Sequence, residues 1–510
     1  MREDWIECTL DDIAKWGSGG TPKSTNPDYY NGDIPWLIIG DLNDSYVSES
    51  QKSITKLGLD NSSAKLVNAN SVLIAMYGSI GKLGINKIEV ATNQAIAFTQ
   101  KLYSGIYNKY LFHYLFYCRP TLHSQGKGGT QRNISQTVLK KFPFPLISKI
   151  EQKAIVKKIE ELFSSLDSGI ADLKKAQDQL VVYRQAVLKK AFEGELTKEW
   201  RENQTNLPSA DELLEQIKAE RQKYQEQELF KWKDAVKLWK SEGANDKKPA
   251  KPKFIKELIS LTNDELEKLP TLNKYWHWVK ADKIASHEAS SLKAGPFGSS
   301  LKKEFYTESG YKIYGQEQVI ANNHKIGYYY VNKEKYESLI NCAVEPYDIL
   351  ISLVGTVGKV LVLPKDCEDG IINPRLVKIS LNKFYDSIFF KYYFESAFLK
   401  SLYSLKAHGA TMDILNLGII KELPYPLCSK QEQHQIVLEI ESRLSICDKI
   451  EKDIADSLEK AQALRQSILK KAFEGKLLSE EEIAKCKADK DYEPASVLLE
   501  KIKTEKLKSK

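Results

Sequence analysis

Side chains suited to contacting nucleic-acid bases gather in residues 127–133, a stretch that includes two glycines. Arginine matches the edge of guanine, and asparagine or glutamine matches the edge of adenine. A related stretch, residues 406–413, keeps one glycine and one threonine but changes most other side chains. Shared residues suit a role in holding the loop or a phosphate, and differing residues suit base recognition; an ordinary polar surface loop is the alternative. The candidates are Lys127, Thr130, Gln131, Arg132 and Asn133, with His408 and Thr411 in the second stretch.

Two glycine-rich segments, residues 78–82 and 355–359, end in Lys82 and Lys359. A nucleotide-binding P-loop needs four residues between its glycines and a serine or threonine after the lysine. Here two residues separate the glycines and an aliphatic residue follows each lysine, which excludes a P-loop. Two interpretations stay open. Each segment is either a structural turn between strands or a DNA-facing loop whose amides and lysine attract phosphates.

Further candidates follow two similar glycine–proline segments, residues 19–22 and 295–301. Arg375 stands beside Asn373 where the first half of the chain has Gln94 and Ala95 beside Asn93. It either contacts a base or forms a salt bridge on a strand. The candidates for phosphate contact are Lys23, Ser24, Tyr29, Ser299, Ser300, Lys302 and Lys303.

We find no catalytic constellation in the sequence. It contains no amine-methylating Asn-Pro-Pro-aromatic motif, no G-x-G-x-x-G after a strand, no H-E-x-x-H and no credible nucleophile and base. Seven scattered cysteines without a C-x-x-C pair indicate reduced thiols rather than disulfides or a metal site. The 510 residues carry a net charge of +7, without an apolar signal or membrane segment. We expect a cytoplasmic, soluble protein that tolerates a polyanionic partner.

The elements that position these residues are duplicated. Residues 184–196 return almost unchanged as residues 465–477, and the same 281-residue offset holds without a gap from residue 142 to residue 196. Apolar residues every seven positions predict a long helix in each copy, from the Pro-x-Pro-Leu motif to a glycine, Gly194 or Gly475. Their matching registers favour pairing with each other. The predicted contact positions are Leu166, Leu173, Ala176, Leu180, Tyr183 and Val187, with Cys447, Ile450, Ile454, Ala461, Leu464 and Ile468.

Upstream of each helix lies a region rich in short apolar runs and turn residues, which predicts mixed strand and loop. These two regions share only particular segments, so the copies have a common frame and different surfaces. The predicted organisation is 1–147 and 276–428 for the globular domains, 148–196 and 429–477 for the long helices, 197–275 for a charged helical linker and 478–510 for a short helix and tail. The linker is either a partner-docking element or an amphipathic helix packed on its own domain.

With its duplicated Pro-x-Pro-Leu…Glu-Gln and Leu-Lys-Lys-Ala-Phe-Glu-Gly motifs, the chain resembles the specificity subunits of type I restriction-modification systems. The resemblance covers nearly all residues. It implies an α+β fold, in which two mixed α/β target recognition domains are separated by two long helices that pair as an antiparallel coiled coil with pseudo-two-fold duplication. It also implies that each domain recognises half of an asymmetric DNA site, in a system of host defence through DNA methylation.

The resemblance further implies a non-catalytic subunit with double-stranded DNA and two methyltransferase subunits as partners, and it allows for two nuclease or translocase subunits. No cofactor is expected on this chain, because S-adenosylmethionine and ATP belong to the partner subunits in that family. The helix ends suggest partner contacts, although packing within the chain is the alternative for the phenylalanines. A scaffold with duplicated protein-binding ends is the rival function. The candidate partner-binding residues are Phe192, Glu193, Phe473 and Glu474.

Overall fold

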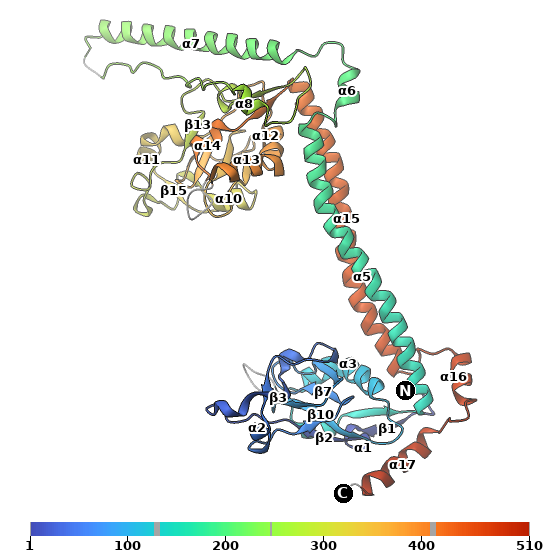
Figure 1. Ribbon diagram of the computed structural model, residues 1–510. Coiled ribbons are helices and arrows are strands. Elements are labelled where there is room, and N and C mark those ends of the chain that lie inside the picture. The colour runs from blue at the N-terminus through green and yellow to red at the C-terminus, as the bar shows by residue number, and fades with distance from the viewer. Residues whose placement is uncertain (1, 127–132, 245–246, 408–414, 509–510) are drawn as a thin grey trace. The chain divides into compact units, whose positions relative to one another are not determined.

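The chain folds into two compact units (Figure 1). The structure is a computed structural model that describes residues 2–126, 133–244, 247–407 and 415–508. Unit 1 comprises Met1–Lys175 and Asp453–Lys510, and unit 2 comprises Ala176–Lys452. Each unit therefore contains one globular domain and one end of each long helix.

Unit 1 contains three sheets, with strand orders β1-β11, β2-β10-β7-β8-β4 and β5-β3-β9-β6. Its strands are β1 (Ile6–Thr9), β2 (Ala14–Ser18), β3 (Tyr30–Leu37), β4 (Ser45–Val47), β5 (Ser53–Ile54), β6 (Leu66–Val67), β7 (Val72–Ala75), β8 (Leu83–Asn86), β9 (Val90–Thr92), β10 (Ile96–Leu102) and β11 (Pro143–Leu146). Its shorter helices are α1 (Leu10–Ile13), α2 (Lys56–Asp60), α3 (Asn108–Ser124), α4 (Gln136–Lys140), α16 (Glu480–Lys487) and α17 (Ala495–Lys508).

Unit 2 repeats this topology except at β4, since its sheets have the strand orders β12-β21, β13-β20-β17-β18 and β15-β14-β19-β16. Its strands are β12 (His277–Val279), β13 (Leu292–Ala294), β14 (Tyr311–Tyr314), β15 (Tyr330–Val331), β16 (Ala343–Val344), β17 (Ile349–Ser352), β18 (Val360–Val362), β19 (Gly370–Ile372), β20 (Leu376–Ile379) and β21 (Tyr425–Leu427). Its shorter helices are α6 (Lys198–Glu202), α7 (Ala210–Ser241), α8 (Asn263–Leu266), α9 (Ala281–Ile284), α10 (Gln316–Ile320), α11 (Lys333–Ser338), α12 (Ser387–Phe394), α13 (Ala397–Ala407) and α14 (Leu417–Glu422).

Strands β7 and β17 occupy equivalent inner positions of their sheets, and each is buried on both faces. In β7, Val72 and Ile74 join the hydrophobic cluster that includes residues of α3, whereas Leu73 and Ala75 join the cluster formed with the second sheet. This alternation follows from the two-residue period of a strand. Strand β17 repeats it in unit 2, because Ile349 and Ile351 enter one cluster and Leu350 enters the other. The sheet is thus held rigidly between two layers.

The two long helices are α5 (Lys149–Phe192) and α15 (Lys430–Phe473), each of 44 residues and related by the 281-residue offset. A serine stabilises each helix start, since the amides of Glu151 and Glu432 donate to the hydroxyls of Ser148 and Ser429 at 3.1 and 3.2 Å. Left-handed glycines terminate both helices, Gly194 at φ 75° and Gly475 at φ 78°. Each long helix therefore begins after the Pro-x-Pro-Leu motif and ends just before its glycine.

The predicted contact positions between the helices are partly confirmed. Every seventh residue of α15 is buried, namely Cys447, Ile454, Ala461 and Ile468. The predictions for Ile450 and Leu464 were wrong, because these side chains are 41% and 50% exposed. Tyr183 is 45% exposed, but its side chain hydrogen bonds to Arg443 of α15, so it does contact the other long helix. At 3.6 residues per turn the contact stripe of a two-helix pair is narrow. Half-buried Arg184 and Arg465 occupy its border instead.

Reciprocal ion pairs show that the helices run antiparallel. In unit 2 the guanidinium of Arg184 contacts Asp448 and Glu451 at 2.7 and 3.0 Å. In unit 1 Arg465 contacts Asp167, and these two residues are the 281-offset equivalents of Arg184 and Asp448. A pair that recurs with its partners exchanged is the signature of an isologous, two-fold-related contact.

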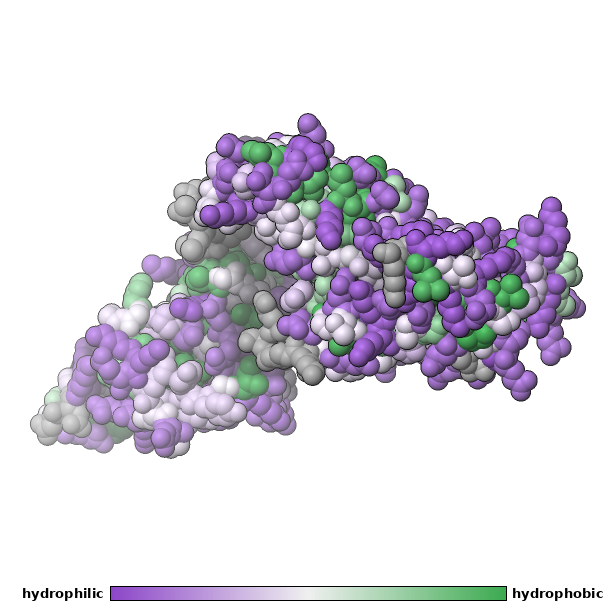
Figure 2. Space-filling model, turned by 90° about the horizontal axis from the view of Figure 1, so that it is seen from below, coloured by the Kyte–Doolittle hydropathy of each residue, from purple (hydrophilic) through white to green (hydrophobic). Residues whose placement is uncertain are grey.

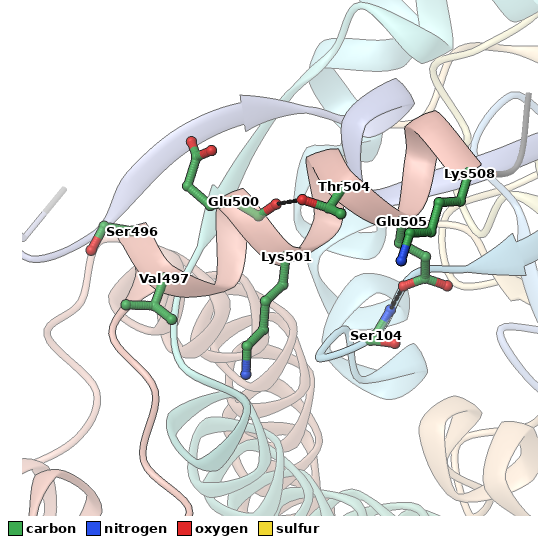
Figure 3. Close-up of a pocket in the computed structure, with 8 residues that line it drawn as sticks. All are labelled: Ser104, Ser496, Val497, Glu500, Lys501, Thr504, Glu505 and Lys508. Atoms are coloured by element: carbon green, nitrogen blue, oxygen red, sulfur yellow. Dashed lines mark hydrogen bonds between the residues drawn. The ribbon is translucent and has the colours of Figure 1, made fainter.

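The second helix after each long helix, α7 or α17, packs against the globular domain of its unit. Leu213 and Ile217 of α7 lie in the core of unit 2, and their sequence equivalents Leu498 and Ile502 of α17 lie in the core of unit 1. The first half of the linker helix therefore packs on its own domain, as one of the two interpretations predicted. Figure 3 shows α17 beside the turn at Ser104, whose amide donates to Glu505 at 2.8 Å.

Candidate nucleic-acid interface

Four segments of the chain meet where strands of the larger sheet in unit 1 end. The amide of Met76 donates to the carbonyl of Ala95 at 2.8 Å, and the amide of Ile134 donates to the carbonyl of Met76 at 3.0 Å. The amide of Gly19 donates to the carbonyl of Ile96 at 3.2 Å. We call residues 19–24, 77–82, 93–95 and 133 the turn edge of unit 1.

The same edge forms in unit 2. The amide of Leu353 donates to the carbonyl of Arg375 at 3.0 Å, and the amide of Gly295 donates to the carbonyl of Leu376 at 2.9 Å. The amide of Arg375 donates to the side chain of Asn373 at 2.9 Å, as the amide of Ala95 does to Asn93 at 3.2 Å. We call residues 295–303, 353–359 and 373–375 the turn edge of unit 2. The two edges share one hydrogen-bonded frame.

The glycine-rich segments are tight turns, which resolves their structural role. Gly81 and Gly358 have φ of 80° and 75°, a conformation that favours glycine. A Cβ atom at Gly81 would lie 2.9 Å from Cγ of Arg119, and one at Gly358 would lie 2.3 Å from the hydroxyl of Tyr403. The structural-turn interpretation is confirmed, and an additional contact with DNA stays a prediction.

The exposed side chains on the shared frame differ between the units. Unit 1 presents Tyr77, 44% exposed, and Gln94, which is hydrogen bonded to Thr21. Unit 2 presents Phe297, 87% exposed, at the position of Thr21, and the exposed Arg375 at the position of Ala95. A hydrogen-bonded hydroxyl and amide, in Thr21 and Gln94, offer different chemistry to a ligand than an exposed aromatic ring. The two edges are therefore suited to different targets.

The structure places most of the predicted DNA-binding residues that it describes at the two turn edges. Tyr29 is an exception, because its carbonyl accepts the amide of Thr55 beside β3, away from the turns. Lys82 is half-buried, with its amine 3.4 Å from the carbonyl of Ile39. Exposed at the edges are Lys23, Ser24, Asn133, Ser299, Lys302, Lys303, Lys359 and Arg375, with Ser300 half-buried. Lys127, Thr130, Gln131, Arg132, His408 and Thr411 lie outside the described residues.

Several residues at or beside these edges were not predicted as site residues, namely Tyr77, Gln94, Phe297 and the neighbouring Arg119. Arg119 donates to the carbonyl of Gly81 at 2.7 Å and pairs with Asp44, so it fixes the glycine turn from α3. Arg119 is far in sequence from both Gly81 and Asp44, so no sequence pattern indicated these contacts. Phe297 was visible in the glycine–proline segment, but its exposure depends on the fold and could not be inferred.

The phenylalanines at the helix ends are core residues. Phe473 is 6% exposed, and its ring lies 5.1 to 5.5 Å from those of Tyr110, Tyr114 and Tyr117. Phe192 is 5% exposed and contacts two aromatic rings of α12. Packing within the chain is thus the alternative that the structure adopts for both rings. Partner contacts by the neighbouring Glu193 and Glu474 stay a prediction.

The Glu-Gln motif at each helix start is structural. Gln152 donates to the carbonyls of Ile147 and Gly105, both at 3.0 Å, and accepts the amide of Tyr107 at 2.8 Å. Gln433 makes the equivalent three hydrogen bonds in unit 2. A fully buried amide side chain requires such partners. The motif therefore locks each helix to its domain.

Across the described ranges, no group of three or more His, Cys, Asp or Glu side chains is placed to hold a metal ion. Burial raises the pKa of the Cys8 and Cys118 thiols to about 12, which suppresses the reactive thiolate. Within the same ranges, every helix is too short or too polar to cross a membrane. The visible face in Figure 2 is mostly hydrophilic, with hydrophobic residues in small separate patches.

Two similar units, each with one turn edge, and two paired helices of equal length define a duplicated protein with two different turn edges. The family model of the type I restriction modification DNA specificity domain matches residues 2–175 and 297–460. The chain therefore belongs to this family.

Relatives and solved structures agree with this assignment. The specificity subunit of the type I restriction enzyme EcoDI from Escherichia coli is 24% identical, covering 99% of this chain and 96% of the relative. The EcoBI specificity subunit from Escherichia coli is 22% identical, covering 100% and 94%. A chain from a study of assembly and conformational transition in a type I R-M system has a TM-score of 0.62 at 14% identity, covering 94% and 99%. The HsdS subunit of Thermoanaerobacter tengcongensis has a TM-score of 0.52 at 14% identity, covering 94% and 98%. These structures establish the same fold, which confirms the predicted fold class.

Proposed function

We propose that this chain is the DNA specificity subunit of a type I restriction-modification complex, and that each turn edge recognises one half of an asymmetric, bipartite site. The observation that carries the proposal is one hydrogen-bonded frame with different exposed side chains. Met76–Ala95 in unit 1 and Leu353–Arg375 in unit 2 make the same backbone contact, but Ala95 and Arg375 offer different chemistry. Recognition of two different half-sites needs this combination.

Each edge supplies both kinds of contact that sequence-specific DNA binding uses. Lysines such as Lys23 and Lys359 are exposed and suit phosphate contacts, which position the protein without selecting a sequence. Exposed Gln94 and Arg375 suit the edges of adenine and guanine. We assign base selection to the second group and affinity to the first.

The long helices serve as the spacer and as the attachment site for two methyltransferase subunits in this proposal. A helix of 44 residues is about 66 Å long. Inserting one heptad in each helix adds about 10 Å and should lengthen the unread DNA between half-sites by roughly three base pairs. An active complex with an unchanged spacer would show that the helices do not set it. S-adenosylmethionine, and ATP where a nuclease subunit is present, belong to the partner subunits.

The test is to map methylated adenines across the host genome with and without this chain. A split, asymmetric motif that disappears on deletion supports the proposal and identifies both half-sites. Exchanging residues 1–140 for the same region of a relative should then change one half-site only, and a change in both would contradict it. A protein-binding scaffold predicts no methylation change and no salt-dependent DNA binding.

A further inference from the structure

Phe297 is the most prominent apolar side chain at either turn edge. Its side chain is 87% exposed, although it is flanked by exposed polar residues, Ser299 and Lys302. Other aromatic rings of the unit, such as those of Tyr314, Phe389 and Tyr393, are buried in its two cores. A single exposed ring is common on a protein surface, but this ring lies on the turn edge to which we assign DNA recognition.

The loop that carries Phe297 is fixed at both ends. Pro296 is buried, and Leu301 is 4% exposed in the core shared with β14 and β19. The amide of Ser300 donates to the carbonyl of Phe297 at 2.8 Å, which closes a turn directly after the ring. Gly295 ties the start of the loop to Leu376. The ring is thus presented by a braced loop beside Arg375.

We propose that Phe297 is a wedge that inserts between adjacent base pairs of the half-site recognised by unit 2. This inference rests on the proposed function. Apolar side chains inserted at a base step unstack and kink the duplex, and they act beside cationic groups that hold the phosphates. Here Lys302, Lys303 and Arg375 supply these groups. The wedge adds selection by the deformability of the base step, without hydrogen bonds to bases.

The wedge belongs to unit 2 alone. The equivalence of Gly19 and Gly295 in the shared frame places Thr21 where unit 2 has Phe297. Thr21 is hydrogen bonded to Gln94, so unit 1 presents a polar pair at this position. Unit 1 should therefore leave its half-site stacked, and deformation should be confined to the other half.

The test uses the full chain in complex with its methyltransferase subunits and duplexes that contain the mapped site. 2-Aminopurine, which fluoresces when unstacked, is placed in turn at each step of both half-sites. We expect increased fluorescence at one step of the unit 2 half-site, lost in Phe297→Ala. This variant should bind roughly 5- to 150-fold more weakly, the range for loss of one base–aromatic stack. Phe230→Ala, which removes a 65% exposed ring on α7, is the matched control and should change neither signal.

A second duplex distinguishes loss of the wedge from general damage to the Phe297→Ala protein. An abasic position at the wedge step removes the unstacking cost, so the wild-type complex should bind it more tightly while Phe297→Ala gains less. Unchanged fluorescence and affinity in Phe297→Ala would overturn the inference and leave the proposed function intact. Loss of methyltransferase from the purified variant would also overturn it, because the ring would then contact protein. A wild-type complex that does not select the mapped site would refute the proposed function itself.

Discussion

Replacing Phe473 with alanine should destabilise unit 1 by about 3–5 kcal/mol, the range for deleting a buried phenyl ring. The upper part of this range applies because the surrounding rings cannot close the cavity. The hydroxyl of Tyr110 donates to Pro145 at 3.2 Å and that of Tyr114 donates to Pro143 at 2.7 Å, so both rings are tethered. The residual cavity then adds its own cost to the lost transfer free energy.

The assay is hydrogen exchange of the full chain, followed separately in peptides from α3 of unit 1 and α12 of unit 2. Phe473→Ala should accelerate exchange in α3 and leave α12 unchanged. Phe192→Ala is the mirror-image control, because Phe192 contacts Phe389 and Tyr393 of α12 at 5.3 and 5.1 Å. It should accelerate exchange in α12 alone.

The refuting result is unchanged exchange in α3 together with loss of the methyltransferase from Phe473→Ala. The ring would then act at a partner interface and not in the core. Glu474→Gln separates the two roles, since this carboxylate is partly exposed and Lys476, its hydrogen-bond partner, lowers its pKa. A partner contact at the helix end predicts weaker assembly in Glu474→Gln with normal exchange in α3.

Three further predictions concern single residues. Gly81→Ala should lower the free energy of unfolding by at least about 1 kcal/mol, because φ at Gly81 is 80° and alanine is strained there. Gly169→Ala is the control: this glycine lies in a helix with open space around it, so alanine should raise the free energy of unfolding. Chemical denaturation measures both changes. Arg375→Ala should weaken the selectivity for one base pair of one half-site by about 1–3 kcal/mol, with unchanged stability of the fold. If methylation mapping shows that selectivity is lost in both half-sites, direct recognition of a base by Arg375 is excluded. Burial lowers the pKa of His113 from 6.5 to about 4, so the unfolded chain binds a proton first as pH falls through this window. Wild type should therefore lose up to about 3 kcal/mol between pH 6.5 and 4 relative to His113→Phe in parallel denaturation series.

The long helices could be predicted closely from the sequence because their signals are local. A serine before each helix, a glycine after it and a constant offset fix the boundaries of α5 and α15. The residues that form the contact between the two helices were predicted less well. Ile450 and Leu464 follow buried positions by three residues and were therefore assigned to the contact, but both are exposed. The reciprocal pairs Arg184–Asp448 and Arg465–Asp167 were available in the sequence as residues sharing the offset, but only the paired helices reveal their contact.

The binding edges could be predicted only in part, because their hydrogen bonds join segments far apart in the chain. Residue types indicated Arg375 and Lys359, and the structure places both at one edge. The contribution of Arg119 to the turn at Gly81 depends on α3 packing over β8, which residue types do not encode. The exposure of a side chain could not be predicted from its residue type either. Phe473 is 6% exposed and Phe297 is 87% exposed, although both are phenylalanines.

The shared frame explains how this fold can change its target without refolding. The amides and carbonyls of Met76, Ala95, Leu353 and Arg375 hold each edge, and backbone groups are unaffected by most changes of side chain. Substitutions at exposed positions away from caps and cores usually change stability by less than about 0.5 kcal/mol, whereas a bidentate base contact contributes about 1–3 kcal/mol of discrimination. Because the cost to the fold is smaller than the change in recognition, the two edges were free to diverge. The helices, whose buried residues and reciprocal ion pairs constrain each other, were not.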